Sequence, residues 1–333
     1  MKLLSHSNGI HKVDKDKVSK RRVLKKCIIF IVGLLIFGFA IQMITNVFDN
    51  ERLKSRFKYI RIDGNKMEYK FKKSGDYTVV FDGAIGTNIY EWDTVCRELE
   101  QTKISTFIYN RRGYGFNDGG EIRTPEEQAK DLKALLKKAG ASEPYILVGE
   151  EYGSLVTTNF VSLYPDSVAG VVLINPISEE KIKTNEFKES IKSEYYRSQF
   201  EKIGTNFSLT SLLSEMGLTM ENNIFKEHLT ESELAEFNSF KNNKKYKEAV
   251  SNELKNLYKG VSNSQIDGLL SNKPLYLITD NEEDPIKKIG NAAVTTVYKE
   301  EIEGSPFSLL DSNTIVNGVN SVLKDAKKTA KKS

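Results

Sequence analysis

The chain has 333 residues, of which 39% are hydrophobic and 28% charged, a composition typical of a globular protein with one large core or two modest ones. Its formal net charge of +4 is small, and no nucleic-acid-binding motif accompanies it, so we expect no nucleic-acid partner. Cys27 and Cys96 are the only cysteines, and they imply no disulfide framework.

The N-terminal part predicts a membrane anchor. Residues 27–48 form a run of 22 residues without a charge, which as a helix can cross a hydrocarbon core about 30 Å thick. Eight Lys and Arg residues lie in 12–26 and five in 49–63. This bias places the N-terminus in the cytoplasm and the main domain outside the cell. A cleaved signal peptide is the alternative, but no A-x-A-like site follows the run.

The next part of the chain alternates strand and helix patterns. Apolar, β-branched runs bounded by turn residues predict strands in 59–72 (two short ones), 77–81, 104–109, 145–148, 168–174, 274–279 and 293–298. Helical spacing predicts helices in 90–101, 124–139, from the turn after 148 to about 164, and from about 311 onward. Such alternation indicates an α/β fold with a mostly parallel sheet covered on both faces.

Residues 177–272 interrupt this alternation with a polar segment that has helical spacing in three places. We expect a helical lid over the carboxyl edge of the sheet, where such folds place their sites. A helical domain unrelated to any site is the alternative. The predicted divisions are a basic cytoplasmic N-terminus (1–26), a transmembrane helix (27–48), the first part of the core (49–176), the lid (177–272), and the last part of the core with a basic tail (273–333).

The segment LVGEEYGSL, residues 147–155, connects a predicted strand to a predicted helix. Gly149 and Gly153 have the spacing of the nucleophile elbow G-x-S-x-G, in which a serine stands on a sharp strand-to-helix turn. Glu151 occupies the position of that serine, and Glu150 precedes it. The sequence therefore retains the glycines of the turn and replaces the nucleophile with a carboxylate.

Residues 79–180 resemble the α/β-hydrolase superfamily, in particular its membrane-anchored or secreted bacterial members. VVFDGAIGTNIYEW stands where that family has its H-G oxyanion segment, YNRRGYGFNDGG is similar to its D-R-x-G-x-G-x-S turn, and YILVGEEYGSLVTTNFVSLYPDSVAGVVLINP matches its elbow and next strand. The resemblance implies the α/β-hydrolase fold, and it implies acyl transfer by a serine, a histidine and an acid, aided by backbone oxyanion donors.

Measured against this pattern, the catalytic triad is degenerate. Glu151 stands at the nucleophile position, Asp284 fits the acid position, and Pro306 stands at the base position. The histidines of the chain are His6, His11 and His228. We expect the first two across the membrane from the domain and the third on the surface of the lid. Loss of the serine or histidine from a triad costs on the order of 10⁶ in turnover.

We expect Asp82, Gly83, Glu150 and Tyr152 to form a binding site around the turn. Backbone donors at Gly83 or Ala84, and at Tyr152, are compatible with an oxyanion site, but the carboxylates of Asp82, Glu150 and Glu151 oppose a developing negative charge. Neighbouring carboxylates favour a cationic ligand instead, either an amine or a lysine-rich partner. A hard metal ion held by the same carboxylates is a further alternative, although the spacing matches no recognised metal signature.

The leading hypothesis is therefore a single-pass cell-membrane protein of the α/β-hydrolase type, with a helical lid, that has lost serine-hydrolase catalysis. We expect it to bind a small-molecule or protein ligand and to need no cofactor. The alternative is an active hydrolase of ester, epoxide or halide type that uses Glu151 as a carboxylate nucleophile.

Overall fold

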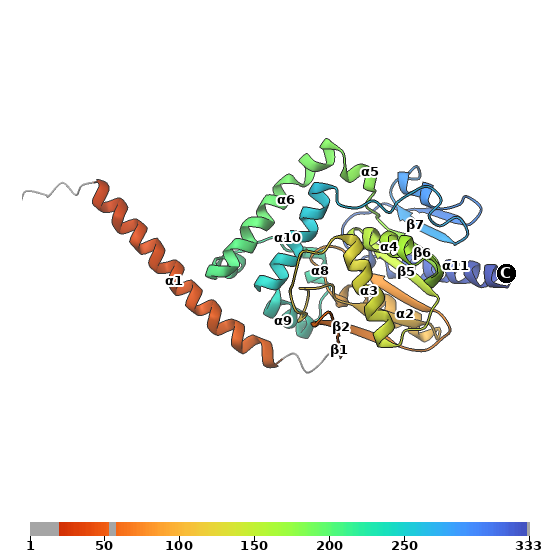
Figure 1. Cartoon of the computed structure of the whole chain (residues 1–333), viewed down its shortest axis with the longest axis horizontal. Coiled ribbons are helices and arrows are strands. Elements are labelled where there is room, and N and C mark those ends of the chain that lie inside the picture. Colours follow the sequence, from red (N-terminus) through yellow and green to blue (C-terminus); the bar gives the residue numbers. More distant parts are fainter. Residues whose placement is uncertain (1–19, 53–57, 332–333) are drawn as a thin grey trace, which may run out of the picture.

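The computed structural model of the protein describes residues 20–52 and 58–331 (Figure 1). An eight-stranded sheet forms its centre, with strand order β1-β2-β4-β3-β5-β6-β7-β8. β2 pairs antiparallel with β1 and β4, and every other neighbouring pair is parallel. The strands are β1 (Lys58–Ile62), β2 (Asn65–Lys72), β3 (Thr78–Asp82), β4 (Ser105–Tyr109), β5 (Tyr145–Glu150), β6 (Val168–Ile174), β7 (Leu275–Thr279) and β8 (Thr295–Lys299).

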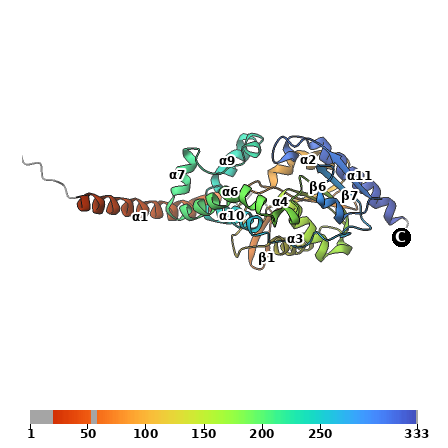
Figure 2. The ribbon, with the colours of Figure 1, turned by 90° about the horizontal axis from the view of Figure 1, so that it is seen from above.

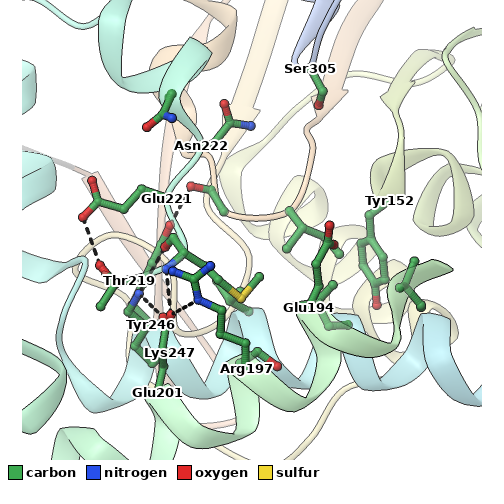
Figure 3. Close-up of a pocket in the computed structure, with 18 of the residues that line it drawn as sticks. Tyr152, Glu194, Arg197, Glu201, Thr219, Glu221, Asn222, Tyr246, Lys247 and Ser305 are labelled. Carbon is green, nitrogen blue, oxygen red and sulfur yellow. Dashed lines mark hydrogen bonds and ion pairs between the residues drawn. The ribbon is translucent and has the colours of Figure 1, made fainter. Parts of the chain in front are cut away.

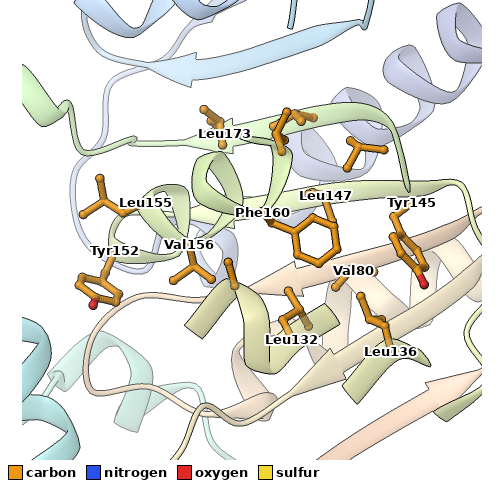
Figure 4. Packing of buried hydrophobic residues seen from close by; sticks show 14 of the residues in the cluster. Val80, Leu132, Leu136, Tyr145, Leu147, Tyr152, Leu155, Val156, Phe160 and Leu173 are labelled. Carbon is orange, nitrogen blue, oxygen red and sulfur yellow. The ribbon is translucent and has the colours of Figure 1, made fainter. Parts of the chain in front are cut away.

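Helices cover both faces of this sheet. Residues of α3 (Pro125–Ala139) and α4 (Tyr152–Leu163) pack on one face, and those of α2 (Asp93–Gln101) and α11 (Ser312–Ala330) pack on the other. Adjacent strand residues point to opposite faces: Leu147 belongs to the first cluster, shown in Figure 4, whereas Ile146 belongs to the second. The prediction of a mostly parallel α/β sheet is confirmed.

Local signals fix the helix that crosses from β4 to β5. Thr124 caps α3 by accepting a hydrogen bond from the amide of Glu127, whose side chain accepts from the amide of Thr124 in return. Pro125 occupies the first turn, and Gly140 ends the helix with a φ of 72°. These residues explain why the predicted and observed bounds of this helix agree closely.

The segment between β6 and β7, predicted as a lid, is helical, and we call it the lid. Its longer helices are α6 (Asn185–Gly204), α9 (Glu231–Phe240) and α10 (Lys244–Lys259), which contain the three stretches of predicted helical spacing. α5 (Glu179–Ile182), α7 (Leu209–Glu215) and α8 (Asn223–Glu227) were not predicted, since so few residues show no clear period. An aromatic cluster joins the lid to the core, with Tyr114 packed edge-on against Tyr246.

Helix α1 (Lys20–Arg52) precedes the core. Its segment Arg21–Ala40 has a mean hydropathy of 2.3, and its length and composition suit either a membrane anchor or a signal sequence. The predicted span 27–48 falls within α1, whereas His6, His11 and most of the basic run 12–26 lie outside the described residues. Figure 1 places α1 at the end of the molecule where α6 lies, and Figure 2 shows one end of α1 beside α6 and α7.

Candidate functional site

The turn between β5 and α4 has the strained backbone of a nucleophile elbow. Glu151 forms the corner with φ 47° and ψ −112°, a region that side-chain-bearing residues rarely adopt. A Cβ on Gly149 would lie 2.6 Å from the hydroxyl of Thr157, and one on Gly153 would overlap the carbonyl oxygen of Asp82. Both glycines are therefore required by close packing, whatever side chain stands between them.

A cavity of about 670 Å³ lies between this turn and the lid (Figure 3). Its core side includes Ile85, Glu151, Tyr152, Ile177 and Ser305, which follow the carboxyl ends of strands or precede the last helix. Its lid side comes from α6, α10 and the segment from α7 to α8. The cavity thus occupies the edge of the sheet where α/β folds bind their ligands.

Glu151 lines this cavity, and its carboxylate is hydrogen-bonded to its neighbours. The side-chain amide of Asn175 donates a hydrogen bond to Glu151 Oε1 at 3.2 Å, and Ser305 also bonds to the carboxylate. Burial raises the pKa of Glu151; these two hydrogen bonds lower it, and the negative charge of Glu194 raises it further. Within residues 58–331, no lysine or arginine forms an ion pair with Glu151 or Glu194.

The far end of the cavity is also charged, but its acids are neutralised by lysines. Glu201 pairs with Lys247 at 2.8 Å (Figure 3). Glu221 pairs with Lys226 and Lys241 at 2.6 Å each. Burial acts to raise the pKa of Glu221, but the hydrogen bonds from the two lysines lower it to about 2. The unpaired negative charge of the cavity therefore gathers at the elbow end.

The expected oxyanion segment is occupied by an acidic side chain of the chain itself. The backbone N–H of Ala84 donates to Glu91 Oε2 at 3.3 Å, and the hydroxyl of Thr87 donates to the same oxygen. A Cβ on Gly83 would overlap this carboxylate, so glycine is needed there. Glu91 is fully buried, and burial raises its pKa to about 7. Sequence reasoning missed Glu91, which no motif marks.

Glu150 faces the core rather than the cavity. Its carboxylate accepts hydrogen bonds from the backbone amides of Phe307 and, at 3.3 Å, Ser308. Burial and then the negative charge of Glu91 raise the pKa of Glu150 well above its ordinary value. These amides directly follow Pro306, so Glu150 holds the loop in which the resemblance places a histidine.

Asp82 and Gly83 are enclosed in a buried network that joins the core to the lid. Arg111 pairs with Asp82 and, at 2.7 Å, with Glu253 of α10, while the hydroxyl of Tyr109 donates to Asp82 at 2.5 Å. Arg111 also donates to the carbonyl oxygen of Gly83 at 2.8 Å. No group of three His, Cys, Asp or Glu side chains suited to a metal occurs in the described part of the chain.

Of the predicted binding residues Asp82, Gly83, Glu150 and Tyr152, only Tyr152 lines the cavity. Its hydroxyl donates to Gln128 at 3.0 Å and accepts from Asn256 of α10 at 2.9 Å. The ring therefore forms part of the cavity wall while its hydroxyl belongs to the buried network. The assignment of the other three residues to ligand binding remains a prediction.

Asp284, at the predicted acid position, stabilises a local turn. Asp284 caps the 3₁₀ turn Pro285–Ile289 by accepting from the amide of Ile286 at 3.0 Å. It also accepts from the hydroxyl of Thr279 at 3.1 Å. These bonds are those of a turn-forming aspartate.

The side chains of His228 and Ser154 form hydrogen bonds outside the cavity. His228, as expected from the sequence, is exposed, and its Nδ1 lies 2.8 Å from the carbonyl oxygen of Ile224 on its own helix. Ser154 is fully buried; its hydroxyl donates to the carbonyl of Glu151 at 2.5 Å and accepts from the amide of Ile177 at 3.0 Å. Neither side chain is a lining residue of the cavity.

Comparisons with known proteins identify the family of this chain. A family model described as "alpha/beta hydrolase fold" matches residues 77–282. An uncharacterized protein of Bacillus subtilis (strain 168), YqjL, is 30% identical over 121 residues, which are 36% of this chain and 47% of that protein. The alpha/beta hydrolase domain-containing protein VTE7 of Arabidopsis thaliana is 30% identical over 119 residues, 35% of this chain and 36% of that protein. The chain thus matches less than half the length of either relative.

Solved structures share the arrangement at low sequence identity. An epoxide hydrolase from potato has a TM-score of 0.62 and 16% identity, covering 81% of this chain and 99% of that one. An epoxide hydrolase from Bacillus megaterium has a TM-score of 0.60 and 15% identity, covering 80% of this chain and all of its own. At these identities the likeness concerns the fold and not the reaction.

Proposed function

Because the chain belongs to the alpha/beta hydrolase fold family, we propose that it is a membrane-anchored member that binds a small organic cation beneath its lid and does not hydrolyse esters. One observation carries the proposal. Glu151, at the position of the family's nucleophile, lies in the cavity without an ion-pair partner among residues 58–331.

Three features argue against ester hydrolysis. A carboxylate replaces the serine at position 151, Pro306 stands where the resemblance places the histidine, and Glu91 covers the N–H of Ala84. Removal of the nucleophile or base alone costs on the order of 10⁶ in turnover. A carboxylate on the oxyanion donor removes stabilisation of the transition state as well.

The elbow end of the cavity suits an ammonium group attached to an apolar body. Glu151 and Glu194 supply negative charge, and Ile85, Ile177 and the ring of Tyr152 supply apolar surface nearby. A charge-assisted hydrogen bond contributes about 1.5–3 kcal/mol when both partners leave water. Binding therefore gains from charge and from burial of the organic part.

Calorimetry on the full chain in detergent tests this proposal, with hexylammonium as the probe and hexan-1-ol and hexanoate as matched neutral and anionic compounds. We expect hexylammonium to bind most tightly and Glu151→Gln to weaken it about 10- to 100-fold, the equivalent of one charge-assisted bond. Glu126→Gln, which changes an exposed carboxylate on α3, is the control and should bind normally. Equal affinity for hexan-1-ol and hexylammonium would contradict the proposal.

A second experiment addresses catalysis directly. The full chain is offered short- and long-chain nitrophenyl esters and a serine-reactive fluorophosphonate, and we expect neither turnover nor labelling. We would look for labelling at Ser305 first, because its hydroxyl lines the cavity and bonds to Glu151. Labelling of Ser305, or turnover that disappears in Glu151→Gln, would overturn the non-catalytic assignment.

The alternative of a carboxylate nucleophile is favoured by one observation, the position of Glu151 on the strained corner beside the cavity. Attack of the carboxylate on an epoxide carbon would break the ring C–O bond, and the released oxygen would take a proton from water. The product would be a hydroxyalkyl glutamyl ester, whose hydrolysis needs a base to activate water. His228, the histidine within residues 58–331, is exposed and bonded to its own helix. Intact mass spectrometry after treatment with 1,2-epoxyhexane tests this alternative, since an ester formed without a base would accumulate on Glu151.

The membrane part of the proposal concerns α1. We infer that α1 remains as an anchor, with the N-terminus in the cytoplasm and the domain outside, on the basis of its apolar segment and the preceding basic residues. Resistance to extraction by alkaline carbonate and cleavage of the domain by protease added to intact cells are the expected results. A mature protein that begins after residue 48 would show instead that the segment is a signal peptide.

A further inference from the structure

The lid carries a group of large apolar side chains on its outer surface. We call this group the lid patch; it consists of Tyr196, Phe200, Ile203, Phe207, Leu212, Met216 and Leu218, whose exposed fractions run from 37% to 63%. The first four are spaced by four, three and four residues, so they follow one face of α6 and continue into the next turn. Contiguous apolar surface of this kind marks a contact with another apolar phase.

The lid patch adjoins α1. Ser208, next to Phe207, donates its hydroxyl to the carbonyl oxygen of Gly38 at 2.9 Å. Gly38 is buried, and a Cβ there would overlap the carbonyl oxygen of Phe207. Gly38 lies within the uncharged run 27–48. The lid patch therefore meets α1 inside its apolar run.

The two apolar surfaces are continuous at this contact. Ile36, Phe37 and Phe39 of α1 are exposed on either side of Gly38, and Phe207 and Leu212 are exposed on the lid. A bilayer that encloses residues 27–48 would therefore reach the lid patch without any change in the arrangement. Transfer of one large apolar side chain from water is worth about 1.5–3 kcal/mol, so seven such residues favour contact with lipid.

We propose that the lid patch lies against the lipid bilayer that holds α1, so that the lid is a second membrane-binding element of the protein. This inference rests on the proposed role of α1 as an anchor. It goes beyond that role because it places the lid, and not the sheet, against the membrane.

One short segment contributes residues both to the lid patch and to the wall of the cavity. Between Leu212 and Met220, the residues Ser214, Gly217 and Thr219 line the cavity, whereas Met216 and Leu218 belong to the lid patch. The membrane thus lies directly behind one wall of the cavity.

Spin labels on the full chain in lipid nanodiscs test the inference. In a Cys27→Ser background, with Cys96 buried, single cysteines are introduced as Leu212→Cys and Met216→Cys. Phe37→Cys in α1 reports the bilayer, and Lys327→Cys reports water, since α11 lies at the opposite end of the molecule (Figures 1 and 2). All four positions are exposed, so the labels should leave the fold intact, which thermal unfolding of each labelled protein checks.

We expect labels at 212 and 216 to relax faster with oxygen than with a water-soluble nickel chelate, as at 37, and the label at 327 to show the reverse. If 212 and 216 behave like 327 while 37 reports lipid, the lid patch is not on the membrane although α1 is an anchor. If 37 also reports water, the anchor fails together with the inference that depends on it.

Discussion

Glu91 places its carboxylate 3.3 Å from the backbone nitrogen of Ala84, one of the predicted oxyanion donors. The contact is buried and shared with the hydroxyl of Thr87. Beside it lies Glu150, a second fully buried carboxyl group, whose charge interacts with that of Glu91. The core therefore contains two carboxyl groups whose pKa values are raised by burial.

Glu91→Gln should flatten the dependence of stability on pH. The pKa of Glu91 is about 7 in the folded protein against an ordinary value of 4.5, so between these limits the folded state keeps a proton that the unfolded state releases. Stability therefore falls as pH rises through this window, by about 1.4 kcal/mol per pH unit for one proton. Urea unfolding at pH 5 and pH 7 measures the slope; an unchanged slope in the variant would count against this assignment.

Arg111→Ala should loosen the lid from the core. Arg111 is buried between Asp82 and Glu253, and its removal leaves two buried carboxylates without their cation. Breaking a buried pair in this way costs about 3–5 kcal/mol of unfolding free energy. Lys192→Ala, which removes an exposed pair with Glu189 on α6, is the matched control and should unfold like the parent. Equal thermal midpoints for both variants would refute the role of Arg111.

Glu151→Gly should stabilise the protein even though it deletes a side chain. Relief of the backbone strain at φ 47° is worth about 1–3 kcal/mol, and the added freedom of glycine in the unfolded chain costs about 0.5–1 kcal/mol. Glu151→Gln keeps the strain and removes the charge, so it separates the two effects. A thermal midpoint for the glycine variant at or below that of Glu151→Gln would show that the corner is not strained.

Gly153→Ala should destabilise the fold without touching the cavity. The added methyl group would overlap the carbonyl oxygen of Asp82, and overpacking of this kind costs about 1–3 kcal/mol. Gly120→Ala provides the comparison, because the nearest atom to a Cβ there is 3.9 Å away. Chemical unfolding of both variants measures the difference, and similar losses would argue against a packing role for Gly153.

Affinity for hexylammonium should rise with pH. Burial raises the pKa of Glu151, so at low pH a larger share of the protein carries a neutral carboxyl group at the elbow. The probe stays protonated, as a lysine does, up to a pH of about 10. Deprotonation of Glu151 then adds the attraction between the two charges, and calorimetry from pH 5 to pH 8 follows it. An affinity that is constant over this range would exclude Glu151 as the cation-binding group.

Local signals made much of the fold predictable. Alternating apolar strands and capped helices, such as the one between Thr124 and Gly140, gave the sheet and its crossovers, and the spacing of Gly149 and Gly153 located the elbow. Glu194 and Ser305 were not predicted in the site, because their approach to Glu151 depends on how distant segments pack. Glu91 was missed for the same reason, since nothing in its neighbours in sequence indicates a contact with Ala84.

The stretch from Leu212 to Met220 is a thin partition, with exposed apolar side chains on one side and cavity-lining residues on the other. A partition of this kind transmits displacement: a shift of Met216 or Leu218 carries Gly217 and Thr219 with it. If the lid patch lies against the bilayer and the cavity holds a cation, as proposed, bilayer thickness and lateral pressure act on the shape of the binding site. Occupancy in thin and thick bilayers should then differ for one and the same sequence.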